Sequence, residues 1–352
     1  PADSEVYPNE GMSDPPKPFK LFFTRGARPP LSAVDDHGHD VLDQITKLDR
    51  RYPNDFRLER IRGYADEHSL TLNLAKAESQ KPKATVGRTV LLLTGWTDYA
   101  WSSDNLAASQ SHKEMSLPSL QVKDVRGRWR TVIADIGIPV GRPQTVTVDL
   151  TGKFLSASRE VRIVTSMRIY WDQILVDTSD GRVDSRIEKL DPVSAGLRWR
   201  GFSREESADG CEPFGYNYEK VSYLSPWKTM TGRYTREGDV LPLLLRTDDM
   251  FAISRPGDEI AVSFDASKLP PLPAGWKRTF LLYSDGFSKE MDINSASPDQ
   301  ISPLPFHGMT KYPYSWPEHY PLTKERLEYL DKYNTRIVNS PIPRIDAALL
   351  GQ

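Results

Sequence analysis

Leu70-Thr71-Leu72-Asn73-Leu74 places leucine at alternate positions, and the same pattern of bulky apolar residues returns 190 positions later (70 to 260) as Ile260-Ala261-Val262-Ser263-Phe264. Because successive side chains of a β-strand point to opposite faces, this period of two predicts a strand with one buried face. At the same offset, Thr89-Val90-Leu91-Leu92 matches Thr279-Phe280-Leu281-Leu282. The sequence therefore predicts a β-unit used twice, in which a second strand opens into a polar, aromatic loop.

Further strands are expected at short, regular spacing between positions 70 and 176. They are 120–122, 129–133, 145–150 and 161–165, and Gly127, Gly137, Gly141 and Gly152 mark turns between them. Two short helices are expected. The first runs over 40–48 with Asp40 as its cap, and the second over 324–333 with Thr323 as its cap. This pattern favours a mainly β fold with two related antiparallel β-sandwich units of jelly-roll type.

The distribution of prolines and aromatic residues suggests five segments along the chain. A Pro-rich extended arm at 1–30 precedes a first β-sandwich unit at 31–180, an aromatic-rich linking region at 181–240, a second unit at 241–310, and a C-terminal arm at 311–352 that carries a short helix. An extended arm is ordered only when it packs on its own domain or is held by a partner. The sequence leaves both arrangements open.

Composition excludes several functional classes. The 46 basic and 48 acidic residues are interleaved and give a formal charge of −2, so the basic stripe of a nucleic-acid-binding protein is missing. The longest apolar runs, 90–93 and 243–245, are far shorter than the roughly 20 residues that span a bilayer. The single cysteine, Cys211, excludes an internal disulfide framework. Because the chain begins at Pro1, it reads as a mature or processed piece.

Several stretches resemble one protein family. They are Thr94–Tyr99, Asp135–Gln144, Arg168–Ile174, Arg255–Glu259 and Asp285–Asp292. These stretches are similar to the C-terminal region of bacterial FG-GAP-repeat proteins of the ASPIC/UnbV, or cartilage-acidic-protein-like, group, and the resemblance covers the chain from about Phe22 to Tyr314. The resemblance implies an exported or cell-surface protein, with a β-propeller upstream, and a non-catalytic role. It supplies no active-site residue.

The two loops that follow the repeated strands are the strongest candidates for a binding site, since the offset would place them in equivalent positions. The first carries Trp96, Asp98, Tyr99, Trp101 and Asp104, and the second carries Asp285, Phe287, Glu290, Asp292 and Asn294. Exposed rings beside carboxylates and amides suit a carbohydrate, because a sugar stacks its apolar face on a ring and hydrogen-bonds through its hydroxyls. The alternative is that the aromatic residues fill the core and the polar residues cap turns.

The same carboxylates suggest Ca²⁺ as the one cofactor to consider, although no loop of fixed calcium-binding spacing is present. A denser set of metal ligands is Asp35-Asp36-His37-Gly38-His39-Asp40. In an extended segment Asp35, His37 and His39 would point the same way and could hold a divalent ion, as in a metal-dependent hydrolase. The alternative is a solvated helix entry, because acids are favoured in the first turn of a helix.

The expected function follows from the signals that are present. No nucleophile elbow, phosphate-binding glycine loop or reactive cysteine occurs in the sequence. The first expectation is a non-catalytic, exported binding or structural subunit that contacts other subunits or copies of itself through its terminal arms. The second is a carbohydrate-binding module that uses Trp96, Tyr99 and Trp101. The third, more remote, is a metal-dependent hydrolase built on Asp35, His37 and His39.

Overall fold

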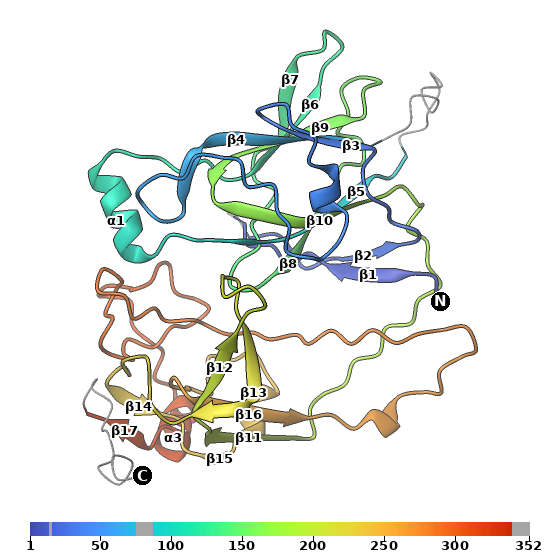
Figure 1. Cartoon of the computed structure of the whole chain (residues 1–352). Coiled ribbons are helices and arrows are strands. Elements are labelled where there is room, and N and C mark those ends of the chain that lie inside the picture. The colour runs from blue at the N-terminus through green and yellow to red at the C-terminus, as the bar shows by residue number, and fades with distance from the viewer. Residues whose placement is uncertain (14–15, 75–86, 340–352) are drawn as a thin grey trace. The chain divides into compact units, whose positions relative to one another are not determined.

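The computed structural model describes residues 1–13, 16–74 and 87–339, and the chain divides into two compact units (Figure 1). Unit 1 comprises Pro1–Arg186 and Leu272–Thr279, and unit 2 comprises Ile187–Pro271 and Phe280–Gln352. Strands dominate both units and every named strand pairing is antiparallel, so the expected mainly β fold is confirmed. None of the helices in the described ranges has the length and apolar character needed to cross a membrane.

Unit 1 is a sandwich of two sheets. The larger sheet has the order β3 (Ser32–Asp35), β4 (Tyr64–Asn73), β9 (Glu160–Met167), β6 (Ser119–Lys123) and β7 (Trp129–Ile133). The smaller sheet has the order β10 (Ile169–Asp177), β5 (Val90–Thr97) and β8 (Gln144–Asp149). Leu70 and Leu72 of β4 share one buried core with Leu91 and Leu93 of β5, so the inner faces of the two sheets pack together as the alternation predicts.

The outer face of β5 is also covered. Val90 and Leu92 point away from the sandwich core and pack against Phe22, which lies in the ribbon of β1 (Glu5–Pro8) and β2 (Leu21–Thr24). This packing explains why β5 reads as a continuous apolar run rather than an alternating one. Of the two arrangements left open for the N-terminal arm, the described parts of 1–30 adopt the first, because burial of Phe22 fixes the arm on its own unit.

Helices differ from the expectation in unit 1. The expected helix over 40–48 is a 3₁₀ helix at Leu42–Ile45, and its N-cap is Val41, which makes no side-chain capping bond, rather than the expected Asp40. The Asp40 side chain instead accepts the Leu42 N–H in the turn that leads into the helix. The helix α1 (Ser102–Gln110) lies in a stretch that was expected to be β throughout. Ala108 is the only buried residue of α1, and the helix carries no apolar stripe of helical period. Hydrophobic periodicity in the sequence therefore could not predict this helix.

The described residues of unit 2 form three small sheets and two α-helices. The first sheet has the order β15 (Gly238–Asp239), β11 (Ser194–Trp199) and β16 (Asp258–Ser263). The other two sheets are the pair β12 (Phe202–Glu206) and β13 (Gly215–Ser222) and the pair β14 (Gly232–Tyr234) and β17 (Arg336–Val338). The helices are α2 (Leu241–Leu244) and α3 (Lys324–Tyr333), and a 3₁₀ turn lies at Ala266–Lys268. The helix α3 has the expected bounds, and Thr323 caps it by accepting the Arg326 N–H. It packs Tyr329 and Tyr333 against Ala195 and Leu197 of β11.

The second copy of the repeated pattern does not fold like the first. Val262 on β16 is 39% exposed, whereas its counterpart Leu72 on the central strand β4 is fully buried. Residues 279–282 form no strand, and Phe280 and Leu282 are exposed, whereas Val90 and Leu92 are buried in β5. The expectation that the two copies of the pattern form equivalent pairs of strands is therefore wrong. The alternation predicted the strand β16, but among its alternating apolar residues only Ile260 packs against a buried core, while Val262 and Phe264 are exposed.

The linking region expected at 181–240 is largely part of unit 2. Five strands, β11 to β15, begin and end within it, whereas β16 is the only strand of the range 241–310. The sheet that buries Leu197 needs β11 and β16 side by side, and these strands lie on either side of the expected boundary at 240. The core of unit 2 is therefore built across the boundary that composition suggested.

Candidate functional site

The aromatic residues at the end of β5 form a stack in unit 1. The Trp96 ring lies 4.8 Å from the Tyr170 ring of β10, with an angle of 17° between the ring planes. Tyr52, from the segment before β4, meets both rings edge-on, at 6.3 and 5.8 Å. The indole N–H of Trp96 is buried and has no hydrogen-bond partner among the described residues.

Asp98 is held inside the fold by two arginines. Its carboxylate lies 2.7 Å from Nε of Arg62 and 3.0 Å from a terminal nitrogen of Arg168, and its side chain is 16% exposed. Arg168 also donates to the backbone carbonyls of Glu59, Ile61 and Tyr64. Both carboxylate oxygens therefore stabilise the junction between β5, β10 and the segment before β4. This is the structural alternative that the sequence left open for Asp98.

The remaining predicted residues of the first loop are divided between capping and exposure. Asp104 accepts the Trp101 N–H at 3.0 Å, so this carboxylate caps α1. Tyr99 and Trp101 are 41% and 37% exposed. The guanidinium of Arg62 lies 5.7 Å from the Trp101 ring centre, in cation–π contact. The loop thus presents two rings and one cation to solvent.

The second predicted loop lies in unit 2 and is not the counterpart of the first, because residues 279–282 form no strand to carry it. Phe287 contacts the Tyr312 ring at 4.9 Å, and Asp292 accepts the Asn294 N–H to close a turn. Asp285 lies 3.4 Å from Nε2 of His307. Among the described residues, neither loop by itself gathers three carboxylates close enough together to hold an ion, so the geometry lends no support to a Ca²⁺ site in either loop.

His307 belongs to a polar cluster that the sequence did not indicate. Its Nδ1 lies 2.5 Å from Asp249, and Asp249 also pairs with Arg326 at 2.7 Å. Hydrogen bonding to Asp249 raises the pKa of His307, against the effect of burial. Burial alone would raise the pKa of Asp249, but its contacts with His307 and Arg326 outweigh this and lower it. These residues are far apart in sequence, and no local spacing connects them.

The three predicted metal ligands do converge, and the fold adds a fourth. Asp35, His37, His39 and Asp55 offer four ligand atoms that all lie within 4.8 Å of one another. Nδ1 of His39 is 3.1 Å from Asp35 and 3.3 Å from Asp55, and Nδ1 of His37 is 3.7 Å from Asp55. Sequence reasoning missed Asp55 because it lies 16 positions beyond His39 (39 to 55), in another segment.

A tight turn after β3 places the two histidines side by side. Asp35 accepts the backbone N–H groups of His37 and His39 at 3.0 and 2.8 Å. Gly38 lies in the left-handed region at φ 89°, which other residues rarely adopt. Burial alone would raise the pKa of Asp35, but hydrogen bonds from His39 outweigh burial and keep this pKa below its usual value. The rings of His37 and His39 lie 6.0 Å apart and nearly parallel.

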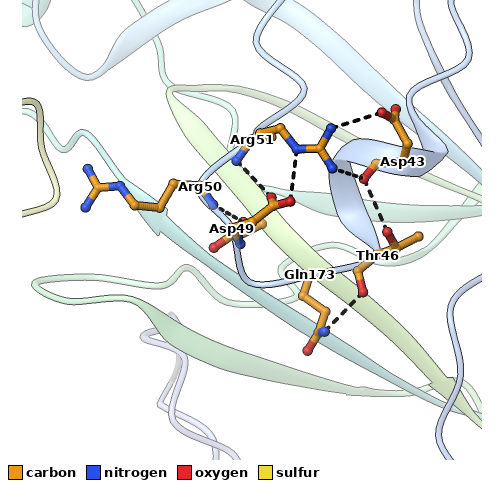
Figure 2. A network of polar contacts seen from close by, with 7 residues as sticks. Asp43, Thr46, Asp49, Arg50, Arg51 and Gln173 are labelled. Carbon is orange, nitrogen blue, oxygen red and sulfur yellow. Dashed lines mark hydrogen bonds and ion pairs between the residues drawn. The ribbon is translucent and has the colours of Figure 1, made fainter. Parts of the chain in front are cut away.

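The segment that carries Asp55 is fixed at its start and near its end. Figure 2 shows the polar network at the start of this segment, which includes Asp43, Thr46, Asp49, Arg50, Arg51 and Gln173. In this network, Gln173 of β10 donates a hydrogen bond to the Thr46 carbonyl. Asp172 of β10 accepts the N–H groups of Asp49 and Arg50, and burial raises its pKa. Next to Asp55, Phe56 stacks on His68 of β4 at 4.1 Å, and burial lowers the pKa of His68.

Unit 2 exposes a second group of large side chains on and after the β12–β13 hairpin. They are Phe214 (39% exposed), Tyr216 (56%), Tyr218 (70%), Tyr223 (58%), Leu224 (63%) and Trp227 (46%). We call this group the hairpin surface. The density of aromatic residues between 199 and 234 is its signal in the sequence, although the sequence did not indicate that they would face outward from a two-stranded ribbon.

Comparison with protein-family models, with curated proteins and with solved structures finds no match to this chain. The resemblance to the FG-GAP-associated group thus stays a prediction.

Proposed function

We propose that the protein is a non-catalytic, exported binding subunit of a larger assembly, and that it docks another protein chain through the hairpin surface. The observation that carries the proposal is the exposure of six large apolar side chains along one short ribbon and the turn that follows it. Large exposed apolar groups commonly mark interaction sites, and an isolated two-stranded hairpin is marginally stable in water. A partner surface that covers these rings would supply the missing packing.

The chemistry of the surface suits a protein partner. Tyrosine and tryptophan dominate the binding energy of protein interfaces, because each buries a large area at a small cost in conformational entropy. Arg200 lies 5.8 Å from the Tyr218 ring and pairs with Glu259 of β16 at 3.1 Å, so this cation supports the ring from within unit 2. This assignment moves the expected contact away from the terminal arms. The N-terminal arm packs within unit 1, and the described residues 311–339 of the C-terminal arm expected at 311–352 contribute α3 and β17 to unit 2. Residues 340–352 of that arm lie outside the described residues.

The native mass of the particle tests the proposal. We expect a species heavier than the 39.9 kDa of one chain, and a Tyr218→Ser, Trp227→Ser double variant that reverts to the single-chain mass. Phe19→Ser is the matched control, because Phe19 is a single aromatic side chain of unit 1 that is 65% exposed. A particle of single-chain mass, or a double variant that stays assembled, would contradict the proposal. Identification of the co-purifying chain distinguishes a second copy from another protein.

A carbohydrate is the second candidate ligand, and the observation that favours it is the exposed pair Tyr99 and Trp101 with Arg62 beside the indole. Two rings offer stacking surfaces for a sugar, and Arg62 offers donors for its hydroxyls. Titration with a panel of polysaccharides, followed by tryptophan fluorescence, should give a saturable change that Trp101→Ala removes and Trp227→Ala retains. A flat response across the panel would argue against this candidate.

Export is part of the proposal, because the family resemblance implies a protein outside the cytoplasm. Fractionation of the source cells, followed by immunodetection of the chain, tests it directly. Recovery in the periplasm, at the surface or in the medium supports export. Recovery with cytoplasmic markers alone would contradict it.

A further inference from the structure

We propose that Asp35, His37, His39 and Asp55 form a closed, four-coordinate site for a divalent ion of the Zn²⁺ type, which ties the turn after β3 to the segment before β4. This inference does not depend on the hairpin surface or on the proposed assembly. It concerns unit 1 alone, and both contributing segments belong to that unit.

The ligand atoms lie at distances that match a tetrahedral site. With metal–ligand bonds of about 2.0–2.2 Å, neighbouring ligand atoms of a tetrahedron are about 3.3–3.6 Å apart. Three of the separations in the cluster are 3.1, 3.3 and 3.7 Å, and all four ligand atoms lie within 4.8 Å of one another. Small rotations of exposed side chains are enough to bring the four atoms to regular positions, since His37, His39 and Asp55 are 52%, 62% and 67% exposed.

The ligand types indicate the class of metal. Imidazole nitrogen is a preferred ligand of Zn²⁺, Co²⁺, Ni²⁺ and Cu²⁺, whereas Ca²⁺ and Mg²⁺ favour oxygen ligands alone. Two carboxylates carry two negative charges and balance the charge of one divalent ion. Asp36 lies 3.5 Å from Nδ1 of His37 and is not one of the four convergent ligands, so it is a natural control.

The number of ligands favours a structural ion over a catalytic one. Catalytic zinc sites keep one coordination position for water or substrate, whereas structural sites fill all four with protein ligands. Asp35 is held firmly for this role, since its side chain is 10% exposed and it accepts two backbone N–H groups of the turn. The fourth ligand, Asp55, therefore argues against the metal-dependent hydrolase expected from Asp35, His37 and His39 alone.

Metal binding at this position would fix a segment that carries the aromatic stack. Asp55 is flanked by Phe56, which stacks on His68 at 4.1 Å and contacts Tyr170 at 5.5 Å. Tyr52 of the same segment contacts Trp96. A bond between Asp55 and the turn after β3 would add a cross-link to the polar network of Figure 2, at the opposite end of this segment.

Isothermal titration of the untagged, chelator-treated full chain with ZnCl₂ tests the inference. We expect one equivalent to bind, and we expect His39→Ala and Asp55→Asn each to weaken binding by more than about tenfold. Asp36→Asn should leave the affinity unchanged. Far-ultraviolet circular dichroism of the metal-free variants shows whether each variant keeps the fold.

Replacement with Co²⁺ tests the coordination number, because four-coordinate Co²⁺ absorbs visible light far more strongly than six-coordinate Co²⁺. A strong band that Asp55→Asn reduces supports the closed site. Three results would overturn the inference: no saturable binding, equal binding by the wild-type chain and His39→Ala, or equal loss in Asp36→Asn and Asp55→Asn. A weak, six-coordinate spectrum would overturn the closed geometry.

Discussion

Asp98→Ala should destabilise unit 1, because Asp98 joins two arginines at the end of β5. Its bond to Arg168 links side chains that are 16% and 12% exposed, and a hydrogen bond between charged groups of this kind contributes about 1.5–3 kcal/mol. Arg62 is 35% exposed, so its bond to Asp98 adds only about 0.2–1 kcal/mol. The two together give about 3 kcal/mol.

Part of the surrounding structure limits this loss. Arg168 keeps its bonds to the carbonyls of Glu59, Ile61 and Tyr64, so its charge is not left without partners when the carboxylate is removed. The larger penalty of an isolated buried charge, about 3–5 kcal/mol, therefore does not apply. Asp98→Asn keeps one acceptor oxygen without the charge and should cost about half as much as Asp98→Ala.

Hydrogen exchange measured peptide by peptide is the suitable assay, since a chain of two units need not unfold in one step. A loss of about 3 kcal/mol speeds exchange in β5, β9 and β10 by roughly 100-fold. Peptides from β11 and β16 should not change, because they belong to unit 2. Asp66→Ala is the control for loss of a surface carboxylate, since the ion pair between Asp66 and Arg57 is exposed and its charged atoms are 3.7 Å apart. Equal exchange in Asp98→Ala and Asp66→Ala would refute the reasoning.

Three further predictions concern the cluster around His307, the repeated strand pattern and a close backbone contact. The pKa of His307 is raised, so the stability that its protonated form contributes is complete below the ordinary pKa of 6.5 and is lost as pH rises through the folded-state pKa. The pKa of Asp249 is lowered, so the stability that its ionised form contributes is complete above the ordinary pKa of 3.8 and is lost as pH falls through the folded-state pKa. Unit 2 should therefore be stabilised most between these values, and His307→Gln should remove the decline above pH 6.5 in urea unfolding. Leu72→Ala should lower the free energy of unfolding by about 2–5 kcal/mol, whereas Val262→Ala at the matching repeat position should cost less than about 1 kcal/mol, because only Leu72 is fully buried; equal midpoint shifts would contradict this. Gly95→Ala should cost about 1–3 kcal/mol by thermal unfolding, because its Cβ would lie 2.4 Å from the Tyr170 carbonyl oxygen, whereas Gly196→Ala meets no atom within 4 Å and should be tolerated.

The candidate metal ligands illustrate how far sequence reasoning reaches. Asp35, His37 and His39 were predicted because a short spacing keeps their side chains close in almost any local conformation. The turn that brings them together follows from Gly38 and from the Asp35 side chain. Asp55 was missed because its place depends on Phe56 stacking against β4, a contact between segments distant in the chain.

The aromatic loops show the opposite case. Trp96, Asp98 and Asp104 were predicted as ligand-binding residues from their types, but the fold uses Asp98 for an ion cluster and Asp104 for a helix cap. Within the first loop, only Tyr99 and Trp101 combine the predicted chemistry with exposure of more than a third. Residue type alone cannot tell a partner inside the fold from a ligand outside it, because both satisfy the same donors and acceptors.

The sequence by itself determined the mainly β class, the strands β4 to β9 of unit 1, the helix α3 with its Thr323 cap, and the local cluster around His37. These features arise from side-chain alternation, capping and turns, which act over a few residues. Tertiary structure alone decided that β11 and β16 share a core, that residues 279–282 form no strand, and that Asp55 and His307 join polar clusters. A strand or a ligand is completed by partners from distant parts of the chain, and the burial that selects those partners depends on all of them together.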